Sequence, residues 1–295
     1  KDLFLSGIAS AGGIITPTAG TSNFRAGVNA GNSIASGGAG NVAVGDEAGT
    51  AITTGNYNTA LGFYALYTED TASKSTAVGT SALQVQNAGT VDAFNTAVGF
   101  AAGVAVTTGV RNTLIGGLAG DALTDADYNV AVGYDSLAID TLGSKAVALG
   151  YAALSTQNFT SATDNFNTAV GFAAGSGITT GTLNTLIGGL AGDAITTGSN
   201  NVALGHDSLG LNTTGDSNTA IGEDALQANT TASNNVAVGR RAMFANTTGT
   251  DNVAMGHNAL DANTTASNNT AIGHDALTDN TTGTYNTAVG SLALE

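Results

Sequence analysis

A short phrase repeats along the sequence at an almost constant spacing, and this repeat limits the possible folds more than any other feature. The phrase reads Asn-Thr/Val-Ala-Val/Ile-Gly, and its glycine recurs sixteen times between Gly27 and Gly290. Most spacings are 17 residues, and the exceptions are one of 18, one of 20 and one of 21. A short unit cannot bury a core alone and must stack on its neighbours, so the sequence predicts a solenoid.

The length of the unit indicates which solenoid to expect. Seventeen residues suit a flattened coil of two short strands and two turns, and each phrase has β-branched residues bounded by glycine and Asn/Thr turn material. We therefore expect an all-β parallel solenoid over residues 23–295, after a lead-in at 1–22. The longer spacings predict extended loops at 84–94 and 155–166. The chain begins at Lys1 and ends partway through a unit, so we expect it to belong to a longer fibre.

The repeated strand has two apolar faces. With the glycine as position 0, positions −3 and −1 carry Thr/Val and aliphatic residues on one face. Position −2 is Ala in thirteen units and lies with the glycine on the other face. One face can fill the interior of the coil, while the other needs a cover. A partner copy of the chain is the simplest source of that cover.

Position −4 is Asn in fourteen of the sixteen units. Stacked at one coil spacing, these residues are expected to form an amide ladder that supports stacking rather than ligand binding. The predicted structural ladder comprises Asn58, Asn95, Asn112, Asn129, Asn167, Asn184, Asn201, Asn218, Asn235, Asn252, Asn269 and Asn286.

Positions +4 and +7 vary together. Where position +4 is Gly, as at Gly192, position +7 is a branched aliphatic residue, here Ile195; where position +4 is Leu or Met, position +7 is polar. Because a close-packed interior tolerates neither a void nor an overfilled slot, each coil is expected to supply one large side chain from either place, never both.

Composition excludes several classes of function. A net charge of −15 opposes binding to nucleic acid and to anionic membranes, and no apolar run is long enough to insert into a bilayer. The absence of cysteine removes disulfides and thiolate metal ligands.

The phrase resembles the head repeats of trimeric autotransporter adhesins, as in NTAIGEDA (218–225) and NVAVGYDS (129–136). The Asn-Thr-Thr-Gly turns, as at Asn212, also resemble the shafts of phage-type tail fibres. The resemblance covers residues 23–295, although the unit here is longer than in adhesin heads. It implies a left-handed parallel β-roll, three chains packed side by side, and an extracellular location on a bacterial surface or a virion tail.

Enzymatic and metal sites find little support. The histidines His206, His257 and His274 all occupy position +1, and we expect exposed turn residues because no carboxylate or cysteine ligand set accompanies them. Calcium stays open as a cofactor, because residues 116–121 and 125–129 only partly match calcium-binding patterns. We predict no catalytic residues, no metal ligands and no other cofactor.

Aromatic residues at the turns are the candidate binding residues. They are Phe63, Tyr64, Phe100, Tyr134, Tyr151 and Phe172. Rings at exposed turns suit a sugar or protein receptor, and packing between neighbouring chains is the alternative.

The sequence thus predicts a non-enzymatic trimeric surface fibre that attaches to a glycan or protein receptor on a host cell or surface. An ice- or crystal-binding solenoid is the main alternative, favoured by seven Thr-Thr pairs at one-coil spacing from Thr179 onward. A polysaccharide-binding or -degrading spike is the third, although the sequence offers no paired carboxylates at glycosidase spacing.

Overall fold

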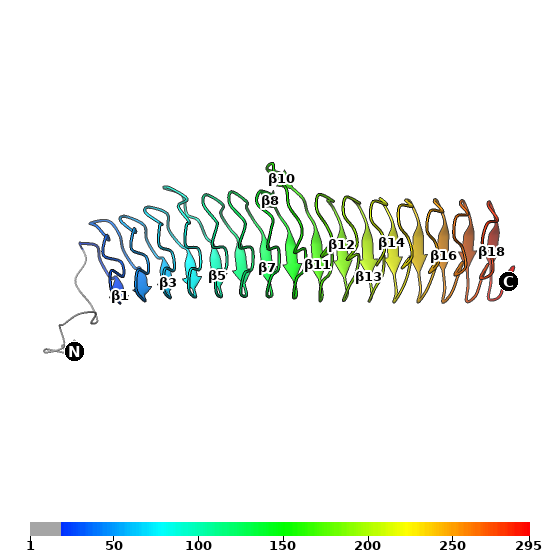
Figure 1. Ribbon diagram of the computed structural model, residues 1–295, viewed down its shortest axis with the longest axis horizontal. Coiled ribbons are helices and arrows are strands. Elements are labelled where there is room, and N and C mark those ends of the chain that lie inside the picture. The colour runs from blue at the N-terminus through cyan, green and yellow to red at the C-terminus, as the bar shows by residue number, and fades with distance from the viewer. Residues whose placement is uncertain (1–18) are drawn as a thin grey trace. The chain divides into compact units, whose positions relative to one another are not determined.

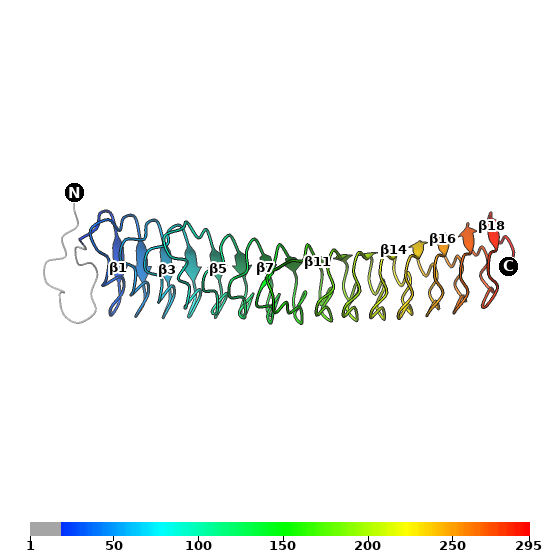
Figure 2. The same ribbon diagram turned by 90° about the horizontal axis from the view of Figure 1, so that it is seen from above.

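The computed structural model describes residues 19–295, so most of the expected lead-in at 1–22 lies outside the described residues. The described residues divide into two compact units, residues 19–135 and 136–295. Each unit is a parallel β-solenoid, with about sixteen coils of about 17 residues in the two together and no helix among the described residues. Figure 1 shows the coils stacking through one strand each, and Figure 2 shows the same strands from above. The predicted all-β parallel solenoid is confirmed.

Each coil contributes one three-residue strand to a parallel sheet. The first unit contains β1 (Phe24–Ala26), β2 (Val42–Val44), β3 (Thr59–Leu61), β4 (Thr76–Val78), β5 (Thr96–Val98), β6 (Thr113–Ile115) and β7 (Val130–Val132). The second contains β9 (Val147–Leu149), β11 (Thr168–Val170), β12 (Thr185–Ile187), β13 (Val202–Leu204), β14 (Thr219–Ile221), β15 (Val236–Val238), β16 (Val253–Met255), β17 (Thr270–Ile272) and β18 (Thr287–Val289). Equivalent repeat positions pair directly, as Ala220 pairs with Ala237.

The expectation of two strands per coil is wrong for the described residues. Among residues 19–295 a second pair of parallel strands occurs at one place, where β8 (Gly143–Ser144) pairs with β10 (Thr163–Asp164), and β10 lies in the loop expected at 155–166. Two isolated parallel bridges, Thr21 to Ala39 and Ser73 to Asp92, are the other pairings outside the main strands. Elsewhere the return arm is built from left-handed corners at positions −5, +2 and +4. In one coil these are Asn234, Arg241 and Met243, with φ of 62°, 57° and 51°. A left-handed residue interrupts the pleat, so the arm stacks by hydrogen bonds without forming a strand.

The interior of each coil is filled as the repeat predicts. The alanines at position −2 are buried, as is the large side chain from position +4 or +7, except Leu294 in the last unit. At Gly192, an added Cβ would lie 2.8 Å from Cδ1 of Ile195 and 2.9 Å from Cδ2 of Leu186. A side chain at both places would therefore overfill the coil, which explains why the two positions alternate.

Glycine at position 0 is required by the backbone. Gly239 has φ of +136°, and a Cβ there would lie 2.4 Å from the carbonyl oxygen of Gly256 in the next coil. No other residue fits both the conformation and the close approach of neighbouring backbones.

The asparagines at position −4 are buried and linked coil to coil (Asn23 and Asn286 in the two end units are half-buried). The principal link joins a side chain to a backbone: Oδ1 of Asn235 accepts the backbone N–H of Asn252 at 3.0 Å. Nδ2 of Asn235 donates to the carbonyl of Gly249 at 2.9 Å. Each asparagine therefore satisfies backbone groups of the adjoining coil, where the sequence suggested amide contacts alone.

A second buried polar ladder runs along position +7, and sequence reasoning missed its burial. Asn229 donates to Oδ1 of Asn212 at 2.9 Å, and Asn246 donates to Asn229 at 3.0 Å. In each such link the later coil donates to the earlier one. The first residue of a ladder therefore needs to accept only, and in two cases that residue is a carboxylate: Glu69 and Asp140.

Candidate functional surfaces

The outward strand face is apolar and uncovered in each unit. Positions −3 and −1 point away from the interior, while the intervening alanine is buried. Leu61 in the first unit is 45% exposed, and Leu204 and Met255 in the second are 44% and 42% exposed. Aliphatic side chains repeated at every coil form an apolar strip along the strands, as expected for the face that needs a cover.

The aromatic candidates lie along position +1, with one exception. Phe63, Phe100, Tyr134, Tyr151 and Phe172 are exposed. Tyr64, at position +2, is half-buried, with its ring 4.1 Å from that of Phe63.

The structure brings only some of these rings together. In the second unit, Tyr151 and Phe172 stack with centroids 5.2 Å apart and planes 9° from parallel. In the first unit, Thr80 separates Phe63 from Phe100, and Gly117 separates Phe100 from Tyr134. The rings therefore stand as separate platforms rather than as one continuous surface.

Position −5 carries a second aromatic row that the sequence analysis did not single out. In the first unit Lys74 lies 5.0 Å from the ring centroid of Phe94, and Arg111 lies 5.2 Å from that of Tyr128. Lys145 and Phe166 repeat the arrangement at 5.1 Å in the second unit. These cation–π contacts use three of the seven Lys and Arg residues, and the shared repeat position in successive units is the signal that reveals them.

The structure shows a structural use for one of the two partial calcium patterns, residues 125–129. The carboxylates of residues 125–129 contact the preceding coil: Asp125 accepts from the Thr108 hydroxyl at 2.6 Å, and Asp127 from the Val110 N–H at 2.7 Å. In residues 116–121, Oδ1 of Asp121 is buried without a hydrogen-bond partner. Burial raises the pKa of the Asp121 carboxyl, and the nearby Asp135 raises it further.

The threonine pairs present one exposed column. The first hydroxyl of a pair bonds to the next coil, as Oγ1 of Thr196 donates to the carbonyl of Thr213 at 3.0 Å. The second threonine of each pair is exposed: Thr180, Thr197, Thr214, Thr231, Thr248, Thr265 and Thr282. In each pair, therefore, only the second threonine faces solvent without donating its hydroxyl to the next coil.

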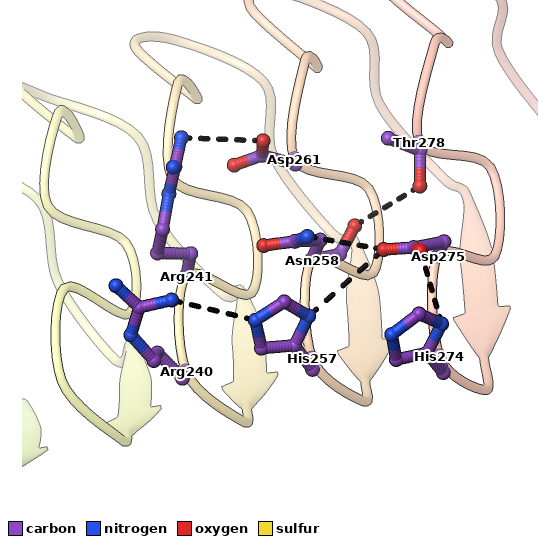
Figure 3. Close-up of polar contacts among 8 residues, drawn as sticks. All are labelled: Arg240, Arg241, His257, Asn258, Asp261, His274, Asp275 and Thr278. Carbon is purple, nitrogen blue, oxygen red and sulfur yellow. Dashed lines mark hydrogen bonds and ion pairs between the residues drawn. The ribbon is translucent and has the colours of Figure 1, made fainter.

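Two of the three histidines meet a carboxylate, contrary to the expectation that none accompanies them. His257 and His274 stack one coil apart, with ring centroids 5.3 Å apart. Nδ1 of His274 lies 3.0 Å from Oδ2 of Asp275, and Nδ1 of His257 lies 4.0 Å from Oδ1 of the same carboxylate (Figure 3). The sequence signal for this cluster is a histidine at position +1 in two successive coils, His257 and His274, with Asp275 at position +2 of the second coil.

Basic and amide side chains surround this cluster. Nη1 of Arg240 lies 3.4 Å from Nε2 of His257, and Arg240 also pairs with Glu223 at 3.1 Å. Asn258 donates to Oδ1 of Asp275 at 3.1 Å. Arg241 lies 3.4 Å from Asp261, whose carboxyl pKa is raised by burial and lowered in part by Arg241.

Unpartnered buried polar atoms concentrate in the same place. In residues 19–295, five buried side-chain nitrogen or oxygen atoms have no hydrogen-bond partner, and one is Oδ1 of Asp121. The other four are Nε of Arg241, Nδ1 of His257, Oδ1 of Asn258 and Oδ1 of Asp261. Native proteins leave few such groups, so this concentration marks a feature that requires a reason.

Comparison of the chain with protein-family models, curated proteins and solved structures gave no match. Across residues 19–295 we find no helix with the length and apolar character that a bilayer crossing requires.

Proposed function

We propose that this chain is a non-enzymatic segment of an extracellular surface fibre, in which three copies pack side by side through their outward strand faces. The observation that carries the proposal is the uncovered apolar strip along the strands of each unit. Burying apolar surface contributes roughly 25 cal/mol per Å², and each coil adds two side chains to the strip. The free energy of association gained per coil is small, but it increases with the number of coils that pack together.

A second copy of the chain is the partner that best fits this strip. The positions that need a cover recur at the same spacing in every copy, so one strip can match another coil by coil. The choice of three copies rests on the resemblance of the repeats to trimeric adhesin heads. Attachment to a glycan or protein receptor on a host surface would then use the exposed aromatic platforms at position +1.

Sedimentation analysis of the purified chain tests the association. We expect a particle of three times the 28.7 kDa chain mass. Leu204→Glu should dissociate it, because each copy would place a charge in an apolar interface. Thr231→Glu is the matched control, since it adds the same charge at an exposed position away from the strands and should leave the mass unchanged. A stable monomer of the unchanged chain would overturn the proposal and favour the single-chain, ice-binding alternative with its threonine column.

A further inference from the structure

We infer that His257, His274 and Asp275 form a binding site for a divalent transition metal of the zinc class, linking two consecutive coils. One nitrogen of each histidine and one carboxylate oxygen lie within 4.8 Å of one another. Two imidazoles and a carboxylate are a ligand set that Zn²⁺ accepts, with the fourth position left for water. Calcium is a poor fit, because it prefers oxygen ligands.

The distance between His257 and Asp275 leaves a gap that an ion could bridge, while His274 contacts the same carboxylate directly at 3.0 Å. The 4.0 Å between Nδ1 of His257 and Oδ1 of Asp275 is too long for a hydrogen bond. Two ligand atoms of a tetrahedral zinc with bonds of about 2.0–2.2 Å lie about 3.3–3.6 Å apart, so His257 and Asp275 have to approach only slightly to share an ion. The unpartnered, buried Nδ1 of His257 faces this gap, so an ion would satisfy an atom that otherwise has no partner.

Binding requires a limited rearrangement. The two imidazole planes lie 11° from parallel, and a metal must lie near the plane of each ring that binds it. The rings therefore have to tilt toward Asp275. His274 is free to do so because its side chain is 58% exposed, while Asn258 holds the carboxylate in place by its 3.1 Å hydrogen bond.

Arg240 opposes the ion. A guanidinium only donates, so its 3.4 Å contact makes Nε2 of His257 the acceptor, with the ring proton on Nδ1. Metal binding through Nδ1 moves that proton to Nε2 and ends the contact. Arg240 then retains its ion pair with Glu223. Removing the Arg240 guanidinium should consequently tighten metal binding.

The chain contains an internal control for general attraction of cations to its negative charge. His206 also occupies position +1, and Asp207 follows it as Asp275 follows His274. The preceding coil has Gly189 at position +1, so His206 has no histidine on that side. A site that needs two histidines should therefore ignore the loss of His206.

Titration of the full chain with Zn²⁺ by calorimetry is the test. We expect one ion per chain, and binding at least about tenfold weaker in His257→Gln and His274→Gln, since loss of even an outer-shell partner has that effect. His206→Gln should bind as the unchanged chain does, and Arg240→Gln more tightly. Circular dichroism would confirm that the variants fold.

Three results would overturn the inference. One is equal binding in the unchanged chain and in His274→Gln, the substitution at the exposed ring. Another is an equal loss in His206→Gln, which would indicate general attraction to acidic groups. The third is one ion per three chains, which would place the ligands on separate copies.

Discussion

Exchanging the large side chain of one coil between its two alternative places is the sharpest test of the packing argument. Leu209 fills the coil from position +4, and Asn212 occupies position +7; both are buried. The variant Leu209→Gly/Asn212→Ile would give this coil the arrangement already present in the chain at Gly49 and Ile52, beside an alanine at position −2.

Each single substitution should destabilise the fold. Leu209→Gly removes a buried side chain, and such truncations cost about 2–5 kcal/mol. Relief of the left-handed conformation, φ 54° at Leu209, offsets about 1–2 kcal/mol of that loss. Asn212→Ile adds a branched side chain to a filled interior, which costs about 1–3 kcal/mol. It also removes the acceptor of the Asn229 amide.

The double variant should recover most of this loss. A volume-conserving exchange costs less than about 1.5 kcal/mol. The polar ladder would simply begin one coil later, because Asn229 keeps its 3.0 Å bond to the carbonyl of Ala232, as Asn212 keeps the equivalent bond to Gly215 in the unchanged chain. In the unchanged chain, the coil before Asn212 has the aliphatic Ile195 at position +7. In the variant, the coil before Asn229 would likewise have an aliphatic residue there, so Asn229 would take the role that Asn212 has now.

Thermal unfolding followed by circular dichroism, with hydrogen exchange to localise the effect, provides the measurement. Thr214→Ala, at an exposed position of the same coil, is the control and should change stability by less than about 0.5 kcal/mol. If the stability loss of the double variant equals the sum of the two single losses, the reasoning is refuted. Two side chains that fill the same space must have coupled effects on the free energy of unfolding.

Two further predictions concern the buried polar groups. Burial raises the pKa of Glu69, so the stability it contributes is present below the ordinary carboxyl pKa and is lost as pH rises through the raised value. We expect the melting temperature of the unchanged chain to fall more steeply toward neutral pH than that of Glu69→Gln, and equal slopes would contradict this. Asn235→Ala leaves the buried N–H of Asn252 unpaired and removes one of the two donors to the carbonyl of Gly249, which keeps Nδ2 of Asn246 at 3.0 Å. At about 1–3 kcal/mol per buried group, it should lower the melting temperature clearly, whereas the exposed Thr248→Ala should not.

The parts of the fold that the sequence predicts are those set by spacing and volume. Residues 17 apart stack, so the strand column, the inward alanines and the alternation between Gly192 and Ile195 follow from the repeat. The return arm does not follow. Leucine at position +4 adopts a left-handed conformation that a local reading would reject, and only the stacked neighbours impose it.

The candidate surfaces were predictable to different extents. The outward strip follows from strand alternation, and the exposed aromatics from their place at the turns. The link between His257 and Asp275 was missed because the two differ by one position as well as one coil. Comparing neighbouring positions across successive coils would have found it.

The left-handed corners have a consequence for how such a chain reaches its folded state. A coil such as 234–250 contains three non-glycine residues in this conformation, each unfavourable by about 1–2 kcal/mol when alone. An isolated coil is therefore a poor nucleus, whereas a coil that forms against a finished one gains its hydrogen bonds and buried side chains at once. Folding should therefore propagate along the chain, with each completed coil serving as the template on which the next coil forms.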